Sequence, residues 1–381
     1  MVVTLTIEAT DGGARAGWLA TPHGRVATPM FMPVGTRAAV KTLDAADLAA
    51  LGAGCVLANA YHLMLRPGAE TVAALGGVHG MSRWPGPMLT DSGGFQIFSI
   101  EGRVHADGVR VRSVYDGSWL DLTPEEVVRV QGLLGADIAM ALDHCLALPA
   151  AEEAVRAAVD RTYAWAERSR IAHAAAGLGT RQALFGIVQG GADPAARERA
   201  AADLVGLDFP GYGIGGLSVG ESKAEMAVAL AAAVGALPAD RPRYLMGVGD
   251  LEGLVDGVAT GVDMFDCVLP TRLGRHARVL TTSGHYSLKR AEHAGDIRPL
   301  VEGCDCAACA AGYSRGTLRH LLALGEPTGA RLVSIHNLRT VTRLMGDIRE
   351  AIAAQRFDDF RAAFHDARIR PPAALPRGRL G

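Results

Sequence analysis

Four polar side chains stand inside or directly after short apolar runs of the sequence: Asp91, Asp143, Gln189 and Asp266. A carboxylate can act as a nucleophile or move a proton, and an amide can both donate and accept hydrogen bonds. Any one of these residues is equally well explained as a helix cap or a turn residue. Four of them at the same end of different strands weaken that explanation. They predict one site at which several carboxylates meet.

Three pairs of glycines follow expected strand ends: Gly93-Gly94, Gly190-Gly191 and Gly215-Gly216. Glycine allows a ligand to approach the backbone closely, or simply allows a positive φ in a turn. Three pairs at one level of a fold predict a flat ligand lying against the backbone. They are not phosphate loops, because the sequence has neither G-x-x-x-x-G-K-[ST] nor a strand-borne G-x-G-x-x-G.

Three of the six cysteines, Cys304, Cys306 and Cys309, fall within one short stretch. Such clustering favours a metal over disulfides. Three thiolates need a fourth ligand to complete a tetrahedron, and His320 and His336 are both within reach. With four protein ligands and no open position, the metal would be structural. The remaining cysteines are expected to pack as small apolar residues: Cys55, Cys145 and Cys267.

A basic segment begins shortly after the last apolar run and includes Arg272, Arg275 and Arg278, with no acidic residue between Asp266 and Glu292. A basic run is usually a solvated face. Beside the expected site, however, a positive rim would hold an anionic polymer in a salt-dependent way. The net charge of the whole chain is −2, so any contact with RNA must come from such a local patch.

The elements that must position these residues alternate between short apolar strands and Ala-rich helices. Eight runs are expected to be strands: Met30–Val34, Cys55–Asn59, Met88–Asp91, Asp137–Leu142, Leu184–Gln189, Tyr212–Gly215, Tyr244–Gly247 and Met264–Val268. The expected helices are Asp44–Leu51, Pro124–Leu134, Ala151–Ala175, Pro194–Leu204, Lys223–Val234 and Leu251–Thr260. Eight buried strands with crossover helices predict a closed (β/α)8 TIM barrel, an α/β fold whose sites lie at the carboxyl ends of the strands. A doubly wound open sheet is the alternative.

The chain of 381 residues, 49% of them hydrophobic, is long enough for a single barrel domain over residues 1–381 with additions. Residues 1–25 are expected to form a small β cap, and residues 92–122 a long insertion. Residues 275–345 are expected to form a zinc-binding subdomain with short strands such as Val279–Thr282 and His285–Leu288. The chain shows neither a secretory signal nor an apolar stretch of about 18 residues, which predicts a cytoplasmic protein without a membrane partner.

Several long motifs, in this order along the chain, resemble those of tRNA-guanine transglycosylases, also called queuine tRNA-ribosyltransferases. They are Asp91–Gln96, Gly186–Gly191, Gly215–Glu221, Tyr244–Gly249 and Phe265–Arg272, together with the C-x-C-x2-C cluster and Ile335-His336-Asn337. The resemblance runs from about Gly17 to about Arg349. Because a single short motif would be weak, it is the number and order of these motifs that make the resemblance specific.

The resemblance implies a double displacement at the wobble guanosine of tRNAs with G-U-N anticodons. Asp266 would attack the ribose C1′, expel guanine and form a covalent ribosyl ester, which a 7-deazaguanine then displaces, with two inversions and net retention. Asp91 matches the general acid/base. The residues that match base-binding positions are Asp143, Gln189, Gly216, Leu217, Phe95, Met246 and Cys145.

The resemblance also implies partners and a cofactor. The anticodon stem-loop of tRNA would lie against Arg272, Arg275, Gly247, Gly249 and Asp250. One structural zinc ion would be bound by Cys304, Cys306, Cys309 and His336, with His336 preferred over His320. A homodimer that packs through the zinc region is expected.

Cys145 and Val219 resemble the bacterial pattern, so the incoming base is expected to be 7-aminomethyl-7-deazaguanine, with Glu221 near its aminomethyl group. The chain departs from the family pattern at His144, at His276-Ala277 and at Asp250. Two alternatives stay open: a non-catalytic RNA-binding homologue, and a family member that inserts queuine itself.

Overall fold

The computed structural model describes residues 2–94 and 102–369. Its core is a sheet of eight parallel strands: β4 (Met30–Pro33), β5 (Val56–Asn59), β6 (Met88–Asp91), β10 (Ile138–Met140), β11 (Ala183–Val188), β12 (Tyr212–Ile214), β13 (Arg243–Leu245) and β14 (Met264–Cys267). The strand order is β4-β14-β13-β12-β11-β10-β6-β5, and a parallel bridge between Val34 and Leu57 joins the two ends. The predicted (β/α)8 barrel is therefore confirmed, and the open sheet was the wrong alternative.

The strands are short, apolar runs because both of their faces are covered. All six residues of β11 are buried, as expected for a strand between the barrel interior and a layer of helices. Several predicted strands were one or two residues too long at their carboxyl ends. Gln189 and Gly215 lie just beyond the ends of β11 and β12, because the chain leaves the hydrogen-bonded sheet there and turns outward.

The helices cover the outside of the barrel. They are α1 (Ala45–Ala50), α2 (Ala60–Leu65), α3 (Ala69–Ala74), α4 (Gly77–Ser82), α6 (Pro124–Leu134), α7 (Glu152–Ala175), α8 (Pro194–Val205), α9 (Lys223–Ala236) and α10 (Leu251–Thr260). Local signals set their ends: α6 begins after Thr123, whose side chain accepts a hydrogen bond from the amide of Glu126, with Pro124 in the first turn. The short helices α2, α3 and α4 between β5 and β6 were not predicted.

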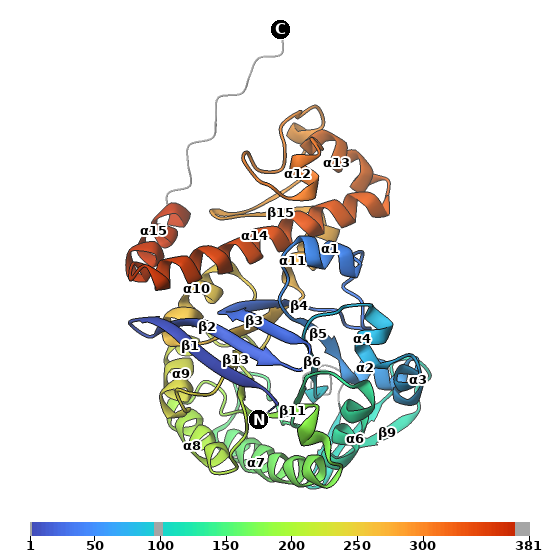
Figure 1. Cartoon of the computed structure of the whole chain (residues 1–381), viewed down its shortest axis with the longest axis vertical. Helices are drawn as coiled ribbons and strands as arrows, with labels where there is room; N and C mark the ends of the chain where they lie inside the picture. The colour runs from blue at the N-terminus through green and yellow to red at the C-terminus, as the bar shows by residue number, and fades with distance from the viewer. Residues whose placement is uncertain (1, 95–101, 370–381) are drawn as a thin grey trace.

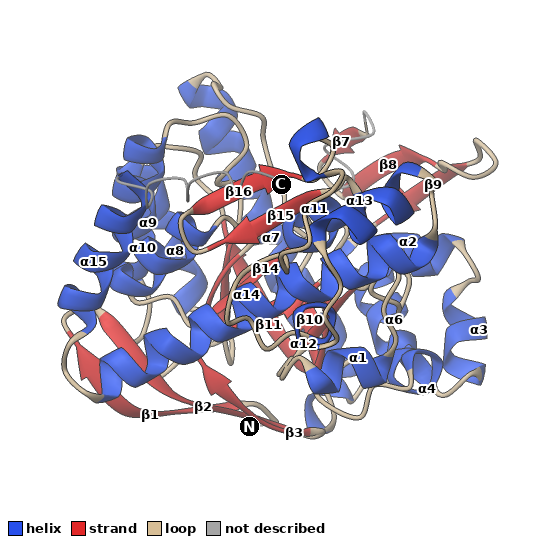
Figure 2. Cartoon of the chain, turned by 90° about the horizontal axis from the view of Figure 1, so that it is seen from above, coloured by secondary structure: helices blue, strands red, loops and turns tan. Residues whose placement is uncertain are grey.

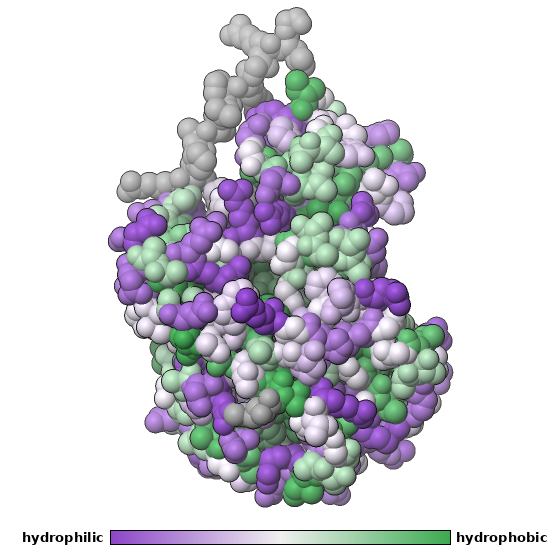
Figure 3. Space-filling model, in the orientation of Figure 1, coloured by the Kyte–Doolittle hydropathy of each residue, from purple (hydrophilic) through white to green (hydrophobic). Residues whose placement is uncertain are grey.

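Two small antiparallel sheets cover opposite ends of the barrel (Figure 2). The sheet β1 (Thr4–Asp11), β2 (Ala14–Thr21) and β3 (Gly24–Thr28) leads into β4 and closes the amino-terminal end, as predicted for a β cap. On this face, hydrophilic and hydrophobic side chains are interspersed (Figure 3). The sheet β7 (Arg103–His105), β8 (Gly108–Arg112) and β9 (Trp119–Leu122) belongs to the predicted insertion and lies toward the carboxyl ends of the strands.

The carboxy-terminal part combines a hairpin with helices. It contains α11 (Leu269–Arg275), β15 (Arg278–Thr281), β16 (Gly284–Ser287), a one-turn 3-10 helix (Ala291–His293), α12 (Ala307–Ala310), α13 (Arg315–Ala323), α14 (Pro327–Ala353) and α15 (Phe357–Ile369). Another one-turn 3-10 helix, Leu178–Thr180, lies in the barrel between α7 and β11. Figure 1 shows α14 crossing the molecule between the barrel and the region of α12 and α13. This helix continues past residue 345 and packs on β1, β2 and β4, so it also belongs to the outer layer of the barrel.

Within residues 2–94 and 102–369, no helix has both the length and the apolar composition that crossing a lipid bilayer requires.

Candidate active site and metal centre

A cavity of about 400 Å³ opens at the carboxyl ends of the barrel strands. This is the end of a TIM barrel at which active sites are found. All four polar residues singled out in the sequence line it: Asp91, Asp143, Gln189 and Asp266. They come from the ends of β6, β10, β11 and β14, so barrel closure brings together side chains that are far apart along the chain.

Asp266 is held by one of its two oxygens. Its Oδ1 accepts hydrogen bonds from the hydroxyl of Tyr244 at 2.6 Å and from the amide of Gly247 at 2.7 Å. Among the described residues, no donor is hydrogen-bonded to Oδ2. Burial raises the pKa of Asp266, although these two donors oppose the rise. The carboxylate is thus oriented by its neighbours with one oxygen free in the cavity.

Asp91 ends β6 and is held by the last residue of β5 and the first residue of α2. Its Oδ2 accepts a hydrogen bond from Asn59 Nδ2 at 2.6 Å, and its Oδ1 accepts one from the amide of Ala60 at 3.0 Å. Burial raises the pKa of Asp91 to about 7, and the carboxylates of Asp266 and Asp143 add to the rise. A carboxyl group with a pKa near neutrality can both give and take a proton under physiological conditions.

Asp143 and Gln189 form a hydrogen-bonded pair in the cavity wall. Gln189 Nε2 donates to Asp143 Oδ2 at 2.7 Å, and Ser92 donates to Asp143 Oδ1 at 3.2 Å. Burial raises the pKa of Asp143 to about 6 despite these donors. The pair presents a hydrogen-bonding edge to the cavity, which suits a flat polar ring.

Two of the three glycine pairs contribute directly to the cavity. A Cβ at Gly94 would lie 2.2 Å from an oxygen of Asp143, and one at Gly216 would lie 2.2 Å from Oε1 of Gln189, so neither position has room for a side chain. Gly190-Gly191 does not line the cavity. A Cβ at Gly190 would lie 2.9 Å from the backbone nitrogen of Arg197, so this pair allows α8 to approach instead. The expectation that all three pairs face a ligand was wrong for this one.

The remaining predicted site residues divide into two groups. Cys145, Leu217, Met246, Gly247 and Arg272 line the cavity, and burial raises the pKa of the Cys145 thiol to about 12, so the thiol is neutral. Phe95 lies outside the described residues.

The other group lies beyond the cavity lining. Arg275 lies at the end of α11, and Gly249 is packed against Cys267. Asp250 caps α10 by accepting a hydrogen bond from the amide of Gly253 at 2.9 Å. Glu221, expected near an aminomethyl group, accepts hydrogen bonds from the amides of Ser218 and Val219.

The departures from the family pattern have local structural consequences. His144 points to α7, where Arg161 Nη1 lies 2.9 Å from its Nδ1, and burial lowers the pKa of His144 to about 4. It does not line the cavity. Ala277 adopts a left-handed backbone conformation with φ of 62°, a region that favours glycine over residues with a Cβ.

Three residues that support the site were missed in the sequence. Asn59 follows the same rule as the others, a polar residue at the end of an expected strand, and could have been found by it. Arg197 is a charge on the apolar stripe of α8 that also carries Ala200, Ala201 and Leu204. Tyr244 gives no such signal, because an aromatic residue is ordinary in a buried strand.

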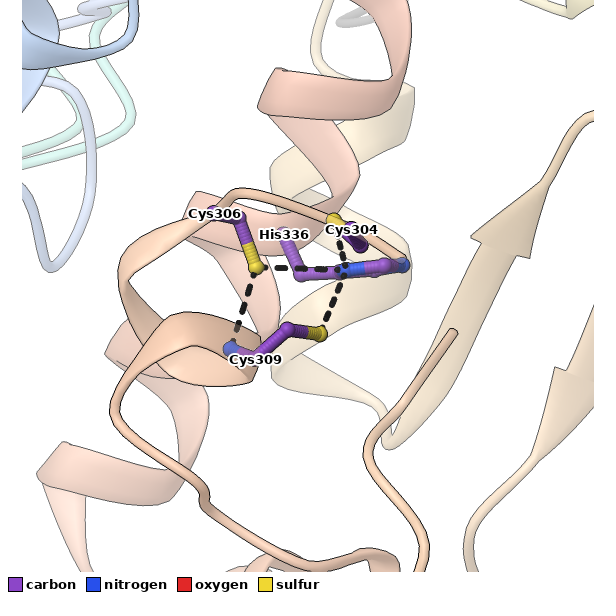
Figure 4. A group of neighbouring side chains, drawn as sticks. All are labelled: Cys304, Cys306, Cys309 and His336. Atoms are coloured by element: carbon purple, nitrogen blue, oxygen red, sulfur yellow. Dashed lines mark hydrogen bonds between the residues drawn. The ribbon is translucent and has the colours of Figure 1, made fainter. Parts of the chain in front are cut away.

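A separate cluster joins the segment around α12 to α14. Cys304, Cys306, Cys309 and His336 could hold a metal ion, and Figure 4 shows the four side chains converging. The three sulfurs lie 3.5, 3.4 and 3.6 Å from Nδ1 of His336. Nε2 of His336 lies 3.0 Å from the carbonyl oxygen of Leu280, which fixes its proton there and leaves the Nδ1 lone pair facing the sulfurs. His320, the other candidate, is exposed on α13.

Comparison with known proteins decides the family. A family model described as queuine tRNA-ribosyltransferase matches residues 10–370. The chain belongs to the queuine tRNA-ribosyltransferase family. The match is longer than the stretch from about Gly17 to about Arg349 over which the motifs predicted it.

Relatives named queuine tRNA-ribosyltransferase are similar over nearly their whole length. The protein from Moorella thermoacetica is 50% identical over 368 residues, which cover 96% of this chain and 97% of the relative. The protein from Symbiobacterium thermophilum is 51% identical, covering 92% of this chain and 87% of the relative. The protein from Listeria welshimeri is 49% identical, covering 93% of each. As a queuine tRNA-ribosyltransferase family member, this chain is a transferase.

Proposed function

We propose that this enzyme exchanges the wobble guanine of tRNA for 7-aminomethyl-7-deazaguanine through a covalent ester between Asp266 and the ribose. One observation carries the proposal above all others. Asp266 is held through Oδ1 by Tyr244 and Gly247, while Oδ2 is free of described donors in a cavity that also contains a carboxyl group of near-neutral pKa. A retaining group transfer needs such a pair of carboxyl groups with different roles.

In the first step, Oδ2 of Asp266 forms a bond to C1′ of the ribose as the bond from C1′ to N9 of guanine breaks. The electron pair of that bond leaves with the guanine. The hydrogen bonds to Oδ1 place the carboxylate without occupying the attacking oxygen. The pKa of Tyr244 is raised well above its ordinary value by burial and by the charge of Asp266, so its hydroxyl keeps its proton and remains a donor throughout.

Asp91 would move the protons in both steps. Its pKa of about 7 allows the neutral carboxyl group to protonate the departing guanine. The resulting carboxylate then takes the proton from the incoming base as its nitrogen attacks C1′ and breaks the ester. Each step inverts the configuration at C1′, so the product retains the original configuration.

The cavity wall suits a guanine-like base. Asp143 has acceptor capacity left for the base's N–H groups beyond its bonds to Gln189 and Ser92, and Met246 offers an apolar surface for the ring. The family resemblance implies that Phe95 would cover the other face of the ring; Phe95 lies outside the described residues, so this stays a prediction.

The tRNA would be held at the rim of the cavity. Arg272 lines the cavity from α11, and Arg275 follows one turn later. On the opposite side of β4, the guanidinium groups of Arg37 and Arg66 lie 5.6 and 4.6 Å from the ring centroid of Tyr115. In the proposed complex, these cations would contact phosphates on either side of the reacting nucleoside.

We propose zinc for the metal centre. Tetrahedral zinc with bonds of about 2.3 Å to sulfur and about 2.0 Å to nitrogen places each sulfur about 3.5 Å from the nitrogen. The three distances from His336 Nδ1 lie between 3.4 and 3.6 Å. Four protein ligands leave no open position, so the ion would hold the region of residues 275–345 on α14, which we propose as a zinc-binding subdomain.

Replacing Cys306 with alanine tests this centre. The variant should lose its zinc and be less stable, whereas Cys55→Ala, a substitution of a buried cysteine elsewhere, should keep one zinc ion per chain. Atomic absorption measures the zinc content of both variants. An unchanged zinc content in the Cys306 variant would show that Cys306 is not a ligand.

The direct test of the proposed function is incorporation of labelled guanine into tRNA with a G-U-N anticodon. Incorporation by the wild-type protein and none into tRNA with another anticodon base at the wobble position are expected. Complete inactivity of well-folded protein that binds tRNA would favour the non-catalytic homologue. Competition between 7-aminomethyl-7-deazaguanine and queuine then separates the two catalytic alternatives. Sedimentation of the purified protein tests the proposed homodimer.

A further inference from the structure

A fully buried arginine lies behind the wall of the cavity. Arg197 on α8 is 0% exposed. Its guanidinium donates to four backbone carbonyl oxygens: Gly191 at 2.8 Å, Val188 at 3.1 Å, Gly215 at 2.6 Å and Gly216 at 2.9 Å. Among the described residues, no carboxylate forms an ion pair with it. A buried charge without a counter-ion is costly, so this position calls for an explanation beyond packing.

Electrostatics do not remove the charge. Burial lowers the pKa of Arg197 to about 10, which still leaves the guanidinium protonated at neutral pH. Four carbonyl dipoles therefore solvate a permanent cation. The arrangement uses the planar fork of arginine, because the ammonium group of a lysine has no such set of divergent, coplanar donors.

Two of the four carbonyls belong to the loop that lines the cavity after β12. In a trans peptide, the C=O of one residue and the N–H of the next point in opposite directions. Because the carbonyls of Gly215 and Gly216 point to Arg197, the N–H groups of Gly216 and Leu217 point away from it. Both of these residues line the cavity.

These two N–H groups are available to a ligand. No acceptor among the described residues is hydrogen-bonded to the amide of Gly216 or of Leu217, whereas the next two amides, of Ser218 and Val219, are bound by Glu221. Gly216 has φ of 64° and no room for a Cβ, so the loop is shaped around this peptide orientation. Two adjacent, unpartnered donors at a cavity wall form a binding point for a carbonyl or anionic oxygen.

We propose that Arg197 is a positioning residue that turns the peptides of Gly216 and Leu217 so that their N–H groups donate to the C6 carbonyl of the base. This inference rests on the proposed function, because it names the base. Arg197 acts through the loop and does not touch the base itself. It would thus set the preference for a purine with an oxygen at C6.

The test combines a substitution in the protein with a deletion in the base. Arg197→Lys keeps the charge but lacks the planar guanidinium. Arg199→Lys on the same helix is the matched control, since the side chain of Arg199 is half exposed and forms an ion pair with Asp160 at the surface. Guanine carries the C6 oxygen, and 2-aminopurine lacks it. The KM for labelled guanine and the inhibition constant of 2-aminopurine are measured in the exchange reaction at a temperature at which all three proteins are folded.

Arg197→Lys should raise the KM for guanine about tenfold or more, the effect of losing a hydrogen bond of ordinary strength, while the KM for tRNA changes less than about twofold. The inhibition constant of 2-aminopurine should change little. The preference for guanine over 2-aminopurine should therefore shrink about tenfold in this variant and stay unchanged in Arg199→Lys. A purely structural role of Arg197 would weaken both bases equally and overturn the proposal.

The wild-type protein provides a test that does not depend on the variant folding. It should bind guanine at least about tenfold more tightly than 2-aminopurine, because the two N–H groups would lose their acceptor. Equal binding of the two bases would overturn the proposal. An absence of any guanine exchange by the wild type would instead contradict the proposed function, so the two failures are distinguishable.

Discussion

The amino-terminal end of the barrel, which the β1–β3 sheet covers, is called the closed end here, and the end with the cavity is the open end. At the closed end, Asp137 and Asp263 each lie beside a basic side chain. At the open end, Asp143 and Asp266 are hydrogen-bonded only to neutral donors among the described residues. Asp137 precedes β10 and Asp143 follows it, whereas Asp263 precedes β14 and Asp266 lies near the end of β14. Asp263 accepts two hydrogen bonds from Arg15, at 2.7 and 2.5 Å. Asp266, three residues later, has only Tyr244 and the amide of Gly247.

The consequences for the pKa values differ at only one of the two closed-end carboxyl groups. Burial raises the pKa of Asp263 although Arg15 opposes the rise, whereas the pKa of Asp137 is lowered. Burial alone would raise the pKa of Asp137, but the neighbouring imidazoles of His79 and His23 hold it below its ordinary value. Burial raises the pKa of Asp143 to about 6 and that of Asp91 to about 7, and among the described residues only neutral donors oppose the rise. The comparison teaches that the closed end uses charge to stabilise the barrel. Under the proposed mechanism, the open end would accept a cost in stability in exchange for reactive carboxyl groups.

The largest expected effect is on catalysis at the open end. Asp266→Asn should abolish guanine exchange and the denaturant-resistant adduct with tRNA, because the amide is a poor nucleophile. The fold should remain intact, since the amide oxygen can still accept from Tyr244 and Gly247. Activity assays, gel analysis of the adduct and circular dichroism together check this. Full exchange by the variant would remove the nucleophile assignment.

The matching substitution at the closed end should act on stability instead. Asp263→Asn leaves the buried guanidinium of Arg15 without its counter-charge, and breaking a buried ion pair costs about 3–5 kcal/mol. Urea unfolding measures the loss. Exchange per folded molecule should be retained at low temperature. A free energy of unfolding close to that of the wild type would show that the ion pair at the closed end does not stabilise the barrel.

A smaller effect, dependent on pH, is expected for Asp91→Asn. The folded-state pKa of Asp91, about 7, lies above the ordinary value of 3.8, so the neutral carboxyl group stabilises the fold. This stabilisation is complete below about pH 4 and is lost as the pH rises through 7. Asparagine does not titrate. The free energy of unfolding of the variant, relative to that of the wild type, should therefore rise by about 1–2 kcal/mol between pH 5 and pH 8, a figure reduced for the partial access of solvent to the cavity.

The control for this measurement is Asp203→Asn, which changes an exposed carboxyl group on α8. Its stability relative to the wild type should not vary over the same range. If the free energy of unfolding of Asp91→Asn, measured in urea, did not rise relative to that of the wild type with increasing pH, the assignment of a raised pKa to Asp91 would be wrong.

The smallest effect is expected for His23→Gln at the closed end. His23 Nδ1 lies 2.8 Å from Asp137 Oδ1, but its side chain is 42% exposed. Asp137 keeps His79 and the amide of Met88, so the substitution should cost at most about 1 kcal/mol at pH 6 and leave exchange unchanged. Urea unfolding and the exchange assay check both statements. A loss of more than about 3 kcal/mol would mean that the closed end depends on this histidine far more than its exposure suggests.

Much of the architecture could be predicted from local patterns. The apolar runs located all eight barrel strands, and the capping residue Thr123 located α6 to the residue. These signals are local because hydrogen bonds and side chains within a few residues decide where a helix or strand begins. The short helices α2 to α4 lack such signals, and they were missed.

Polar residues at strand ends predicted the members of the site, and the family resemblance added their roles. Neither predicted the hydrogen bonds that hold them. Tyr244 on β13 donates a hydrogen bond to Asp266 on the adjacent strand β14. Arg197 contacts the loop after β12 only because α8 packs behind that loop. The sequence also did not show whether Gly190-Gly191 faces a ligand or a helix, because either neighbour can require a residue without a Cβ.

By itself, the sequence determined the order of strands and helices, the cysteine cluster and the set of polar residues at the strand ends, since each depends on residues close together in the chain. The tertiary structure alone decided which charges found partners. Arg15 and Asp263 are 248 residues apart, and only closure of the barrel and its cap brings them together. The same closure brings Asp266 and Asp91 into one cavity, where only neutral donors among the described residues are hydrogen-bonded to them, because what surrounds a buried charge is set by contacts between distant segments.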